Sequence, residues 1–100
     1  MKKFLNKYIE DFSNLIISSK KYSDDLIAVK DAIISAAGNG KKTIISGNGG
    51  SAAMASHFSV DLTKNAGIRC INFNEVDLIT CFSNDYGYEH WVEKRLNFMA

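Results

Sequence analysis

The sequence contains no proline and only two cysteines among its 100 residues. Cys70 and Cys81 form neither a CxxC motif nor a pair with metal-ligand spacing, and each lies in an apolar stretch. We therefore expect both to be small, buried core residues. The chain also lacks low-complexity tracts and internal repeats, and its length fits one domain.

An excess of one charge and long apolar runs are also missing. Twelve basic and eleven acidic residues give a net charge of +1, which provides no argument for a nucleic-acid or anionic membrane partner. No apolar run approaches the roughly 20 residues of a membrane span. Near the basic start, Asn6, Lys7, Glu10 and Asp11 interrupt the apolar core that a signal peptide needs. We expect a cytoplasmic protein.

Two helices are predicted at the start of the chain. The first covers residues 1 to about 19, where apolar residues recur at helical spacing along one face. The second begins near Ser23, which can cap it, and Asp24 and Asp25 suit its positive N-terminal end. Gly38–Gly40 ends it, because these residues readily adopt left-handed conformations. The apolar stripe of the first helix comprises Phe4, Leu5, Tyr8, Ile9, Phe12, Leu15 and Ile16.

After residue 40, the spacing of the apolar residues predicts strands that alternate with helices. Thr43–Ile45 is a short β-branched run of the kind found in buried parallel strands, and Ile68–Phe73 is a second candidate. A helix is predicted between them, from Ala52 to about Asn65. Strand, helix and strand in this order predict an α/β fold with a parallel sheet flanked by helices.

The rest of the chain is predicted to be mostly helical. We expect a helix from Val76 to about Phe82, a loop over Ser83–Tyr88 and a last helix over Glu89–Met99. Two strands do not make a free-standing parallel sheet with both faces covered. The chain is therefore expected either to be part of a larger domain or to complete its sheet with another chain. We favour the first, in which residues 1–100 are a single partial domain. Its expected parts are a helical segment, 1–40, and an α/β part, 41–100.

A glycine-rich loop, Ser46–Ser51, joins the first strand to the next helix. Its glycines allow close backbone approach, and N–H groups at the start of a helix favour phosphate. Ser51 adds a hydroxyl donor and is also a candidate helix cap. The loop is not a dinucleotide fingerprint, since Ala52 takes the last glycine position and no acidic residue ends a strand about 20 residues on. The alternative is a plain strand-to-helix turn.

Two polar pairs follow the loop. His57 and Asp61 are four residues apart and share one face of the predicted helix, as an acid–base pair or half of a metal site. The alternative is a solvated surface pair. Asn84 and Asp85 offer an amide and a carboxylate suited to sugar hydroxyls, or else simply form a turn. His90 is interpreted as a surface or packing residue.

These residues resemble the sugar isomerase (SIS) family, and more narrowly the phosphoheptose isomerases. The resemblance is carried by Ser46–Ala53, by Ala55–Phe58 and by Ser83–Tyr88, and the two leading helices also fit. It covers nearly the whole chain but only the N-terminal half of the family. The resemblance implies a homotetramer built through the N-terminal helices. It also implies that a second phosphate loop, and a Gln and a His of the active site, lie beyond residue 100.

The resemblance also assigns roles to individual residues. Residues 48–51 of the glycine loop would contact the substrate and its phosphate, and Asn84 and Asp85 would contact substrate hydroxyls. His57 would be a Zn²⁺ ligand, and Asp61 a metal ligand and the catalytic base. The family usually has Glu at the position of Asp61, so this carboxylate reaches one methylene less far, and placement errors of about 1 Å can cost about 10²-fold in rate. The expected substrate contacts are Asn48, Gly49, Gly50, Ser51, Asn84 and Asp85.

The activity implied by the resemblance is aldose–ketose isomerisation of sedoheptulose 7-phosphate to D-glycero-D-manno-heptose 7-phosphate. We expect the 100 residues alone to be inactive, because the remaining catalytic groups are expected elsewhere. The rival hypothesis is a non-catalytic SIS-domain protein that binds a phosphosugar or acts as a regulatory scaffold. A carboxylate at position 61 argues against this rival, because such relatives lack the acidic residue.

Overall fold

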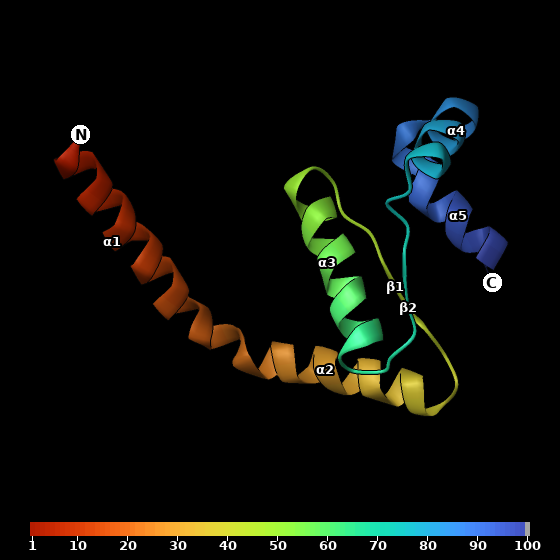
Figure 1. The fold of residues 1–100 in the computed structure, drawn as a ribbon, viewed down its shortest axis with the longest axis horizontal. Helices are drawn as coiled ribbons and strands as arrows, with labels where there is room; N and C mark the ends of the chain where they lie inside the picture. Colours follow the sequence, from red (N-terminus) through yellow and green to blue (C-terminus); the bar gives the residue numbers. More distant parts are fainter. Residues whose placement is uncertain (100) are drawn as a thin grey trace. The chain divides into compact units, whose positions relative to one another are not determined.

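The computed structural model describes residues 1–99, and the chain divides into two compact units. One unit covers Met1–Ile34 and the other continues from Ser35. The first unit contains α1 (Lys2–Ser18), the 3-10 helix η1 (Ser19–Tyr22) and most of α2 (Ser23–Gly38) (Figure 1). Within residues 1–99, no helix has both the length and the apolar character needed to cross a membrane.

The predicted capping role of Ser23 is wrong. The backbone is already helical at Ser23, because the 3-10 turn of η1 leads directly into α2. Its hydroxyl instead donates to the Lys20 carbonyl oxygen at 2.8 Å. The expected end of α2 is confirmed at Gly38, and Gly40 has a φ of 70° in the turn that follows.

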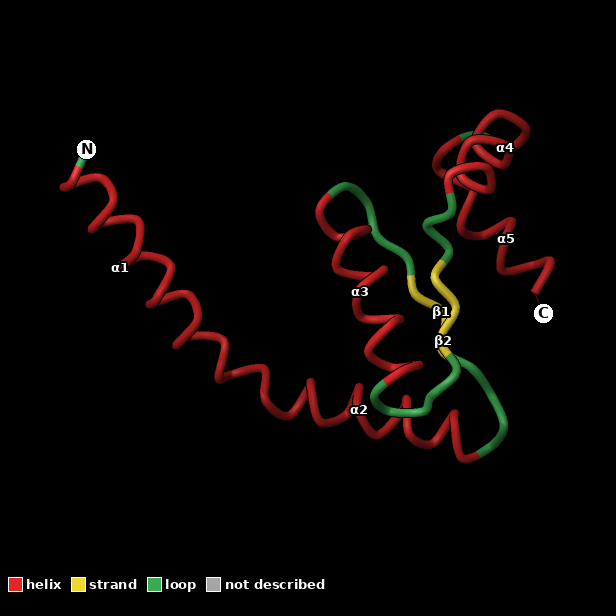
Figure 2. Tube along the Cα trace, viewed as in Figure 1, coloured by secondary structure: helices red, strands yellow, loops and turns green. Residues whose placement is uncertain are grey.

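A parallel sheet and its helices form the second unit (Figures 1 and 2). The two strands pair in parallel with Ile44 opposite Ile71, which confirms the α/β prediction. α3 packs against both strands, and α4 packs against α5. The elements are β1 (Thr43–Ile45), α3 (Gly50–Lys64), β2 (Cys70–Asn72), α4 (Val76–Tyr86), the 3-10 helix η2 (Tyr88–His90) and α5 (Trp91–Met99).

The core of this unit lies between α3, the end of β2 and the start of α5. Its buried apolar side chains are Ala55, Leu62, Phe73 and Trp91, and Phe73 is only 1% exposed. Cys70 is partly buried, and this burial raises the pKa of its thiol. Cys81 is exposed, so the prediction that it is a core residue is wrong. It lies on α4, a helix with no fully buried residue, and its thiol lies 3.7 Å from the Asp85 carboxylate.

Several predicted boundaries need correction. β2 covers only Cys70–Asn72 of the expected Ile68–Phe73, and α5 begins at Trp91 and not at Glu89, because the 3-10 helix η2 precedes it. α3 begins at Gly50, two residues before the expected start. α4 continues to Tyr86, so most of the predicted Ser83–Tyr88 loop is helical. Glu75 caps the start of α4 by accepting a hydrogen bond from the Leu78 amide at 3.1 Å, and the helix ends only at Gly87, whose φ is 90°.

Candidate functional site

The glycine loop lies where β1 ends and α3 begins, at the carboxyl end of the parallel sheet. Gly47 leaves no room for a side chain, since a Cβ there would lie 2.4 Å from both the carbonyl carbon and the oxygen of Ser51. Gly49 has a φ of 55° and a ψ of −122°, a conformation that disfavours other residues. The sequence therefore permits a backbone path here that only glycine adopts readily.

This path leaves donors for an anion. The Ser51 amide donates to the Asn48 carbonyl at 3.0 Å, and the Ala52 amide donates to the Gly49 carbonyl at 3.0 Å. By contrast, the amides of Asn48, Gly49 and Gly50 donate to no protein acceptor within residues 1–99. These three exposed amides meet the start of a 15-residue helix, where the helix dipole favours negative charge.

Ser51 lies inside the first turn of α3 and does not cap it. The N-cap position is Gly49, with no side-chain capping bond. The capping alternative for Ser51 is therefore wrong, because α3 begins earlier than expected. Its hydroxyl remains exposed at the mouth of the loop, where the sequence predicts a substrate contact.

A side chain outside the loop, Asn74, holds the loop in place. Its Oδ1 accepts from the Gly47 amide at 2.8 Å, and its Nδ2 donates to the Gly47 carbonyl at 2.6 Å. Asn74 follows β2, so this pair of bonds links the two strand ends just beyond the sheet. Asn74 was not among the predicted site residues, although an Asn two positions after a parallel strand was a usable signal.

A second amide supports the helix that carries the candidate catalytic pair. Asn72 Nδ2 donates to the Ser56 hydroxyl at 2.8 Å, and Ser56 donates in turn to the Ala52 carbonyl at 3.0 Å. Asn72 Oδ1 also accepts from the Asn74 amide at 3.0 Å. One network therefore connects the end of β2, the loop and the first turns of α3.

His57 and Asp61 lie on one face of α3, as the sequence predicts. His57 Nε2 is 3.6 Å from Asp61 Oδ2, and Asn65 Nδ2 donates to Asp61 Oδ1 at 3.0 Å. The His57 side chain is 80% exposed and that of Asp61 is 49% exposed. A helix rises about 1.5 Å per residue, which places the two residues about 10 Å and about 16 Å along the axis from Gly50.

The donor set of this pair suits Zn²⁺, but it is incomplete. Imidazole nitrogen and carboxylate oxygen are both zinc ligands, and structural and catalytic sites use at least three protein ligands. Within residues 1–99, no cluster of three or more His, Cys, Asp or Glu side chains could hold a metal. His57 and Asp61 therefore supply two side chains of the types that bind zinc, fewer than a zinc site requires.

Asn84 and Asp85 lie in the last turn of α4 and not in a loop, because this helix is longer than predicted. Both are exposed, and Asn84 Nδ2 donates to Asp85 Oδ1 at 3.1 Å. Among the interactions of residues 1–99, none joins this pair to the glycine loop or to His57. The link between the two motifs comes from Tyr88, whose hydroxyl donates to Asn48 Oδ1 at 3.1 Å. Tyr88 was not among the predicted site residues.

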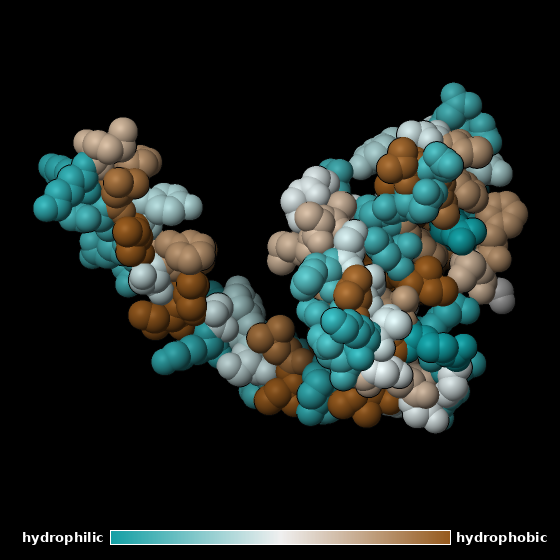
Figure 3. Space-filling model, in the orientation of Figure 1, coloured by the Kyte–Doolittle hydropathy of each residue, from teal (hydrophilic) through white to brown (hydrophobic). Residues whose placement is uncertain are grey.

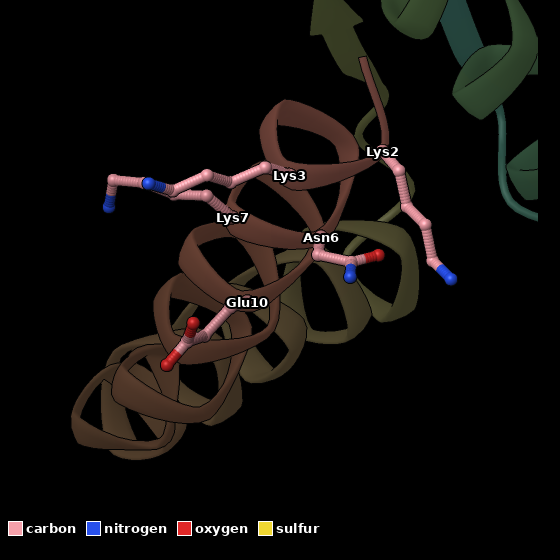
Figure 4. A pocket seen from close by; sticks show the side chains of 5 residues that line it. All are labelled: Lys2, Lys3, Asn6, Lys7 and Glu10. Atoms are coloured by element: carbon pink, nitrogen blue, oxygen red, sulfur yellow. The ribbon is translucent and has the colours of Figure 1, made fainter.

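His90 and the residues of α1 are not among the predicted site residues. His90 Nδ1 is 3.3 Å from a Glu93 carboxylate oxygen, which agrees with the surface role expected for this histidine. A hollow on the surface of α1 contains none of the predicted site residues (Figure 4). It is lined by Lys2, Lys3, Asn6, Lys7 and Glu10.

The chain is similar in sequence to several curated phosphoheptose isomerases. The phosphoheptose isomerase of Geotalea uraniireducens is 35% identical over 81 residues, which cover 75% of this chain and 43% of the relative. Phosphoheptose isomerase 2 of Campylobacter jejuni is 34% identical over 105 residues, covering 92% of this chain and 52% of the relative. The chain is of the phosphoheptose isomerase type. It spans about half the length of these curated relatives.

The fold of this chain is also similar to that of a solved phosphoheptose isomerase. A phosphoheptose isomerase structure from Neisseria gonorrhoeae matches with a TM-score of 0.81 at 22% identity. The match covers 99% of this chain and 54% of that one, which confirms an SIS-type α/β fold over about half of the neighbour. No protein-family model matches the chain.

Proposed function

We propose that the protein is a phosphosugar isomerase that converts sedoheptulose 7-phosphate to D-glycero-D-manno-heptose 7-phosphate. The observation that carries the proposal is the loop in which Asn48, Gly49 and Gly50 offer three unpaired amides at the start of α3. Their donors suit a phosphate or another oxygen of the substrate. Relatives named phosphoheptose isomerase narrow the substrate class to phosphorylated heptoses.

The chemistry that we propose is proton transfer between neighbouring carbons. Asp61 acts as the base and removes the proton from the carbon beside the substrate carbonyl, which gives an enediol. His57, 3.6 Å away, orients this carboxylate or shares a metal with it. A general acid from outside the described residues protonates the carbonyl oxygen as the enediol forms. Asp61 then returns its proton to the former carbonyl carbon, while the neighbouring hydroxyl gives its proton to the conjugate base of that acid. Zn²⁺, when bound by His57 and Asp61, would polarise the carbonyl oxygen.

A second copy of the chain is the partner that we propose for α1. Every residue of this helix is exposed in the single chain, and Phe4, Tyr8 and Phe12 stack in sequence with ring centroids 6.4 Å and 6.5 Å apart. Figure 3 shows the apolar side chains as brown patches along α1. Burial of one large apolar side chain contributes about 1.5–3 kcal/mol, so covering this stripe favours self-association, and the assembly that we propose is a homotetramer.

The isomerase is tested with the full-length protein and sedoheptulose 7-phosphate. Turnover is followed with and without added Zn²⁺, and Asp61→Asn is compared with Asp77→Asn, which changes an exposed carboxylate on α4. We expect Asp61→Asn to abolish turnover and Asp77→Asn to retain it. Lack of turnover by the unmodified protein under both conditions would contradict the proposal. If the sugar phosphate still bound, the scaffold hypothesis would replace it.

A further inference from the structure

Within residues 1–99, the glycine loop and the segment Ser83–Tyr88 are joined by the hydrogen bond between the Tyr88 hydroxyl and Asn48 Oδ1. The bond is 3.1 Å long and joins residues 40 positions apart. Asn48 lies in the glycine loop, and Tyr88 begins η2 directly after the glycine that ends α4. It is the interaction within residues 1–99 that fixes the Asn48 side chain, while Asn74 fixes the backbone of Gly47.

The direction of this bond determines what Asn48 can offer to a ligand. An Asn side chain has an accepting oxygen and a nitrogen with two donor hydrogens. Tyr88 donates to the oxygen, which fixes the orientation of the side chain and leaves both Nδ2 hydrogens for a ligand. Nδ2 makes no hydrogen bond within residues 1–99, and Asn48 is exposed. Its amide is thus available as a donor beside the backbone amides of the loop.

Tyr88 is well placed to hold this orientation. Gly87 has a φ of 90°, which ends α4 and turns the chain into η2. Three residues after Tyr88, Trp91 is buried at 5% exposure and anchors the start of α5. The hydroxyl therefore approaches Asn48 from a short segment between the end of α4 and the buried Trp91.

We propose that Tyr88 is a positioning residue, which turns the Asn48 amide so that its Nδ2 hydrogens bind an oxygen of the anion held by the glycine loop. The identification of that anion as a sugar phosphate rests on the proposed function. The orientation of Asn48 does not, because it concerns an oxyanion at the loop whatever chemistry follows. Tyr88 itself need not touch the ligand.

The test is a double-mutant cycle in the full-length protein, with inorganic phosphate as the calorimetric probe. Tyr88→Phe removes only the hydroxyl, and loss of one hydrogen bond is expected to weaken phosphate binding about 5-fold. Asn48→Ala should weaken binding at least as much. Adding Tyr88→Phe to Asn48→Ala should then have no further effect, because the residue through which Tyr88 acts is gone.

Two further variants sharpen the cycle. Asn48→Asp replaces the donor with a carboxylate oxygen, so it should weaken phosphate binding more than Asn48→Ala does. Tyr86→Phe is the matched control, because the Tyr86 ring packs on Phe82 and its hydroxyl makes no hydrogen bond within residues 1–99. It should leave phosphate affinity unchanged.

The kinetic readout separates positioning from a structural role. With sedoheptulose 7-phosphate, Tyr88→Phe should raise KM about 5-fold and leave kcat nearly unchanged, as expected when ground-state binding is lost. Phosphate binding with the predicted coupling but without turnover would contradict the isomerase and support the positioning role. Independent effects of Tyr88→Phe and Asn48→Ala would overturn the inference, as would an unaltered affinity in Tyr88→Phe or an unmodified protein that binds no phosphate.

Discussion

The N-terminal helix α1 and the glycine loop are held by different kinds of contact. In α1, Lys7 pairs with Asp11 at 3.0 Å and Tyr8 stacks between Phe4 and Phe12, so each contact joins residues four positions apart. At the loop, the bonds from Asn72, Asn74 and Tyr88 join residues 16, 27 and 40 positions apart.

This difference indicates what each region depends on. The contacts of α1 shape a helix but bury none of its residues, so its apolar stripe requires a partner to contribute to stability. The bonds at the loop depend on the fold of the second unit, and they hold amides in place that would otherwise be free to move. The stability of α1 therefore depends on assembly with a partner. The conformation of the glycine loop depends instead on individual hydrogen bonds.

The largest effect is expected from a charge in the stripe of α1. Phe12→Glu would place an unpaired carboxylate in a buried interface, which is strongly unfavourable. We expect the proposed homotetramer to dissociate, as measured by light scattering after size exclusion. Asn14→Glu, on the opposite face of the same helix, should leave the assembly intact. If the unmodified protein is a monomer, α1 does not depend on assembly, and the proposed difference between α1 and the glycine loop is contradicted.

Gly47→Ala should have the next largest effect. The added Cβ would lie 2.4 Å from main-chain atoms of Ser51, so the loop must shift. A displacement of about 1 Å at a site can cost about 10²-fold in rate, and we expect kcat/KM to fall by about that factor. Gly38→Ala is the control, because its Cβ would meet no atom within 4 Å. Retained activity in Gly47→Ala would show that the loop conformation is not critical.

Asn74→Ala should have a smaller effect, because it removes the two hydrogen bonds between the Asn74 side chain and the backbone of Gly47. It leaves the amide and carbonyl of Gly47 without partners, at a cost of about 1–3 kcal/mol in the free energy of unfolding. Asn74→Asp retains an acceptor for the Gly47 amide but loses the donor for its carbonyl, so it should be intermediate. Urea unfolding and phosphate affinity should change in the same order. Equal stability of the unmodified protein and both variants would contradict the role of Asn74 in holding the glycine loop.

The same contrast explains which features could be predicted from the sequence. The helical stripe of α1, the β-branched run at Thr43–Ile45 and the His57–Asp61 pair depend on residues close in sequence, and the structure contains all three. The roles of Asn74 and Tyr88 depend on how the strands and α5 pack, which local spacing does not encode. These two residues were therefore missed.

The boundary errors have a related cause. Ser23 has the composition of a helix cap, yet a preceding 3-10 turn makes its backbone helical, so its hydroxyl bonds backwards to Lys20. Ser83–Tyr86 has the composition of a loop, yet α4 continues until Gly87 takes a positive φ. In both places the neighbouring helix outweighed the intrinsic preference of polar residues for turns.

The smallest effect is expected from Lys7→Ala in α1. The Lys7–Asp11 pair is 3.0 Å long, but its side chains are 75% and 61% exposed, so water and salt screen the attraction. Exposed pairs at this spacing contribute about 0.3–0.5 kcal/mol, and the loss in unfolding free energy should stay within that range. A similar loss in low salt that disappears in 1 M salt would identify the ion pair as its source. A loss as large as that of Asn74→Ala would instead mean that α1 depends on single contacts as strongly as the loop does.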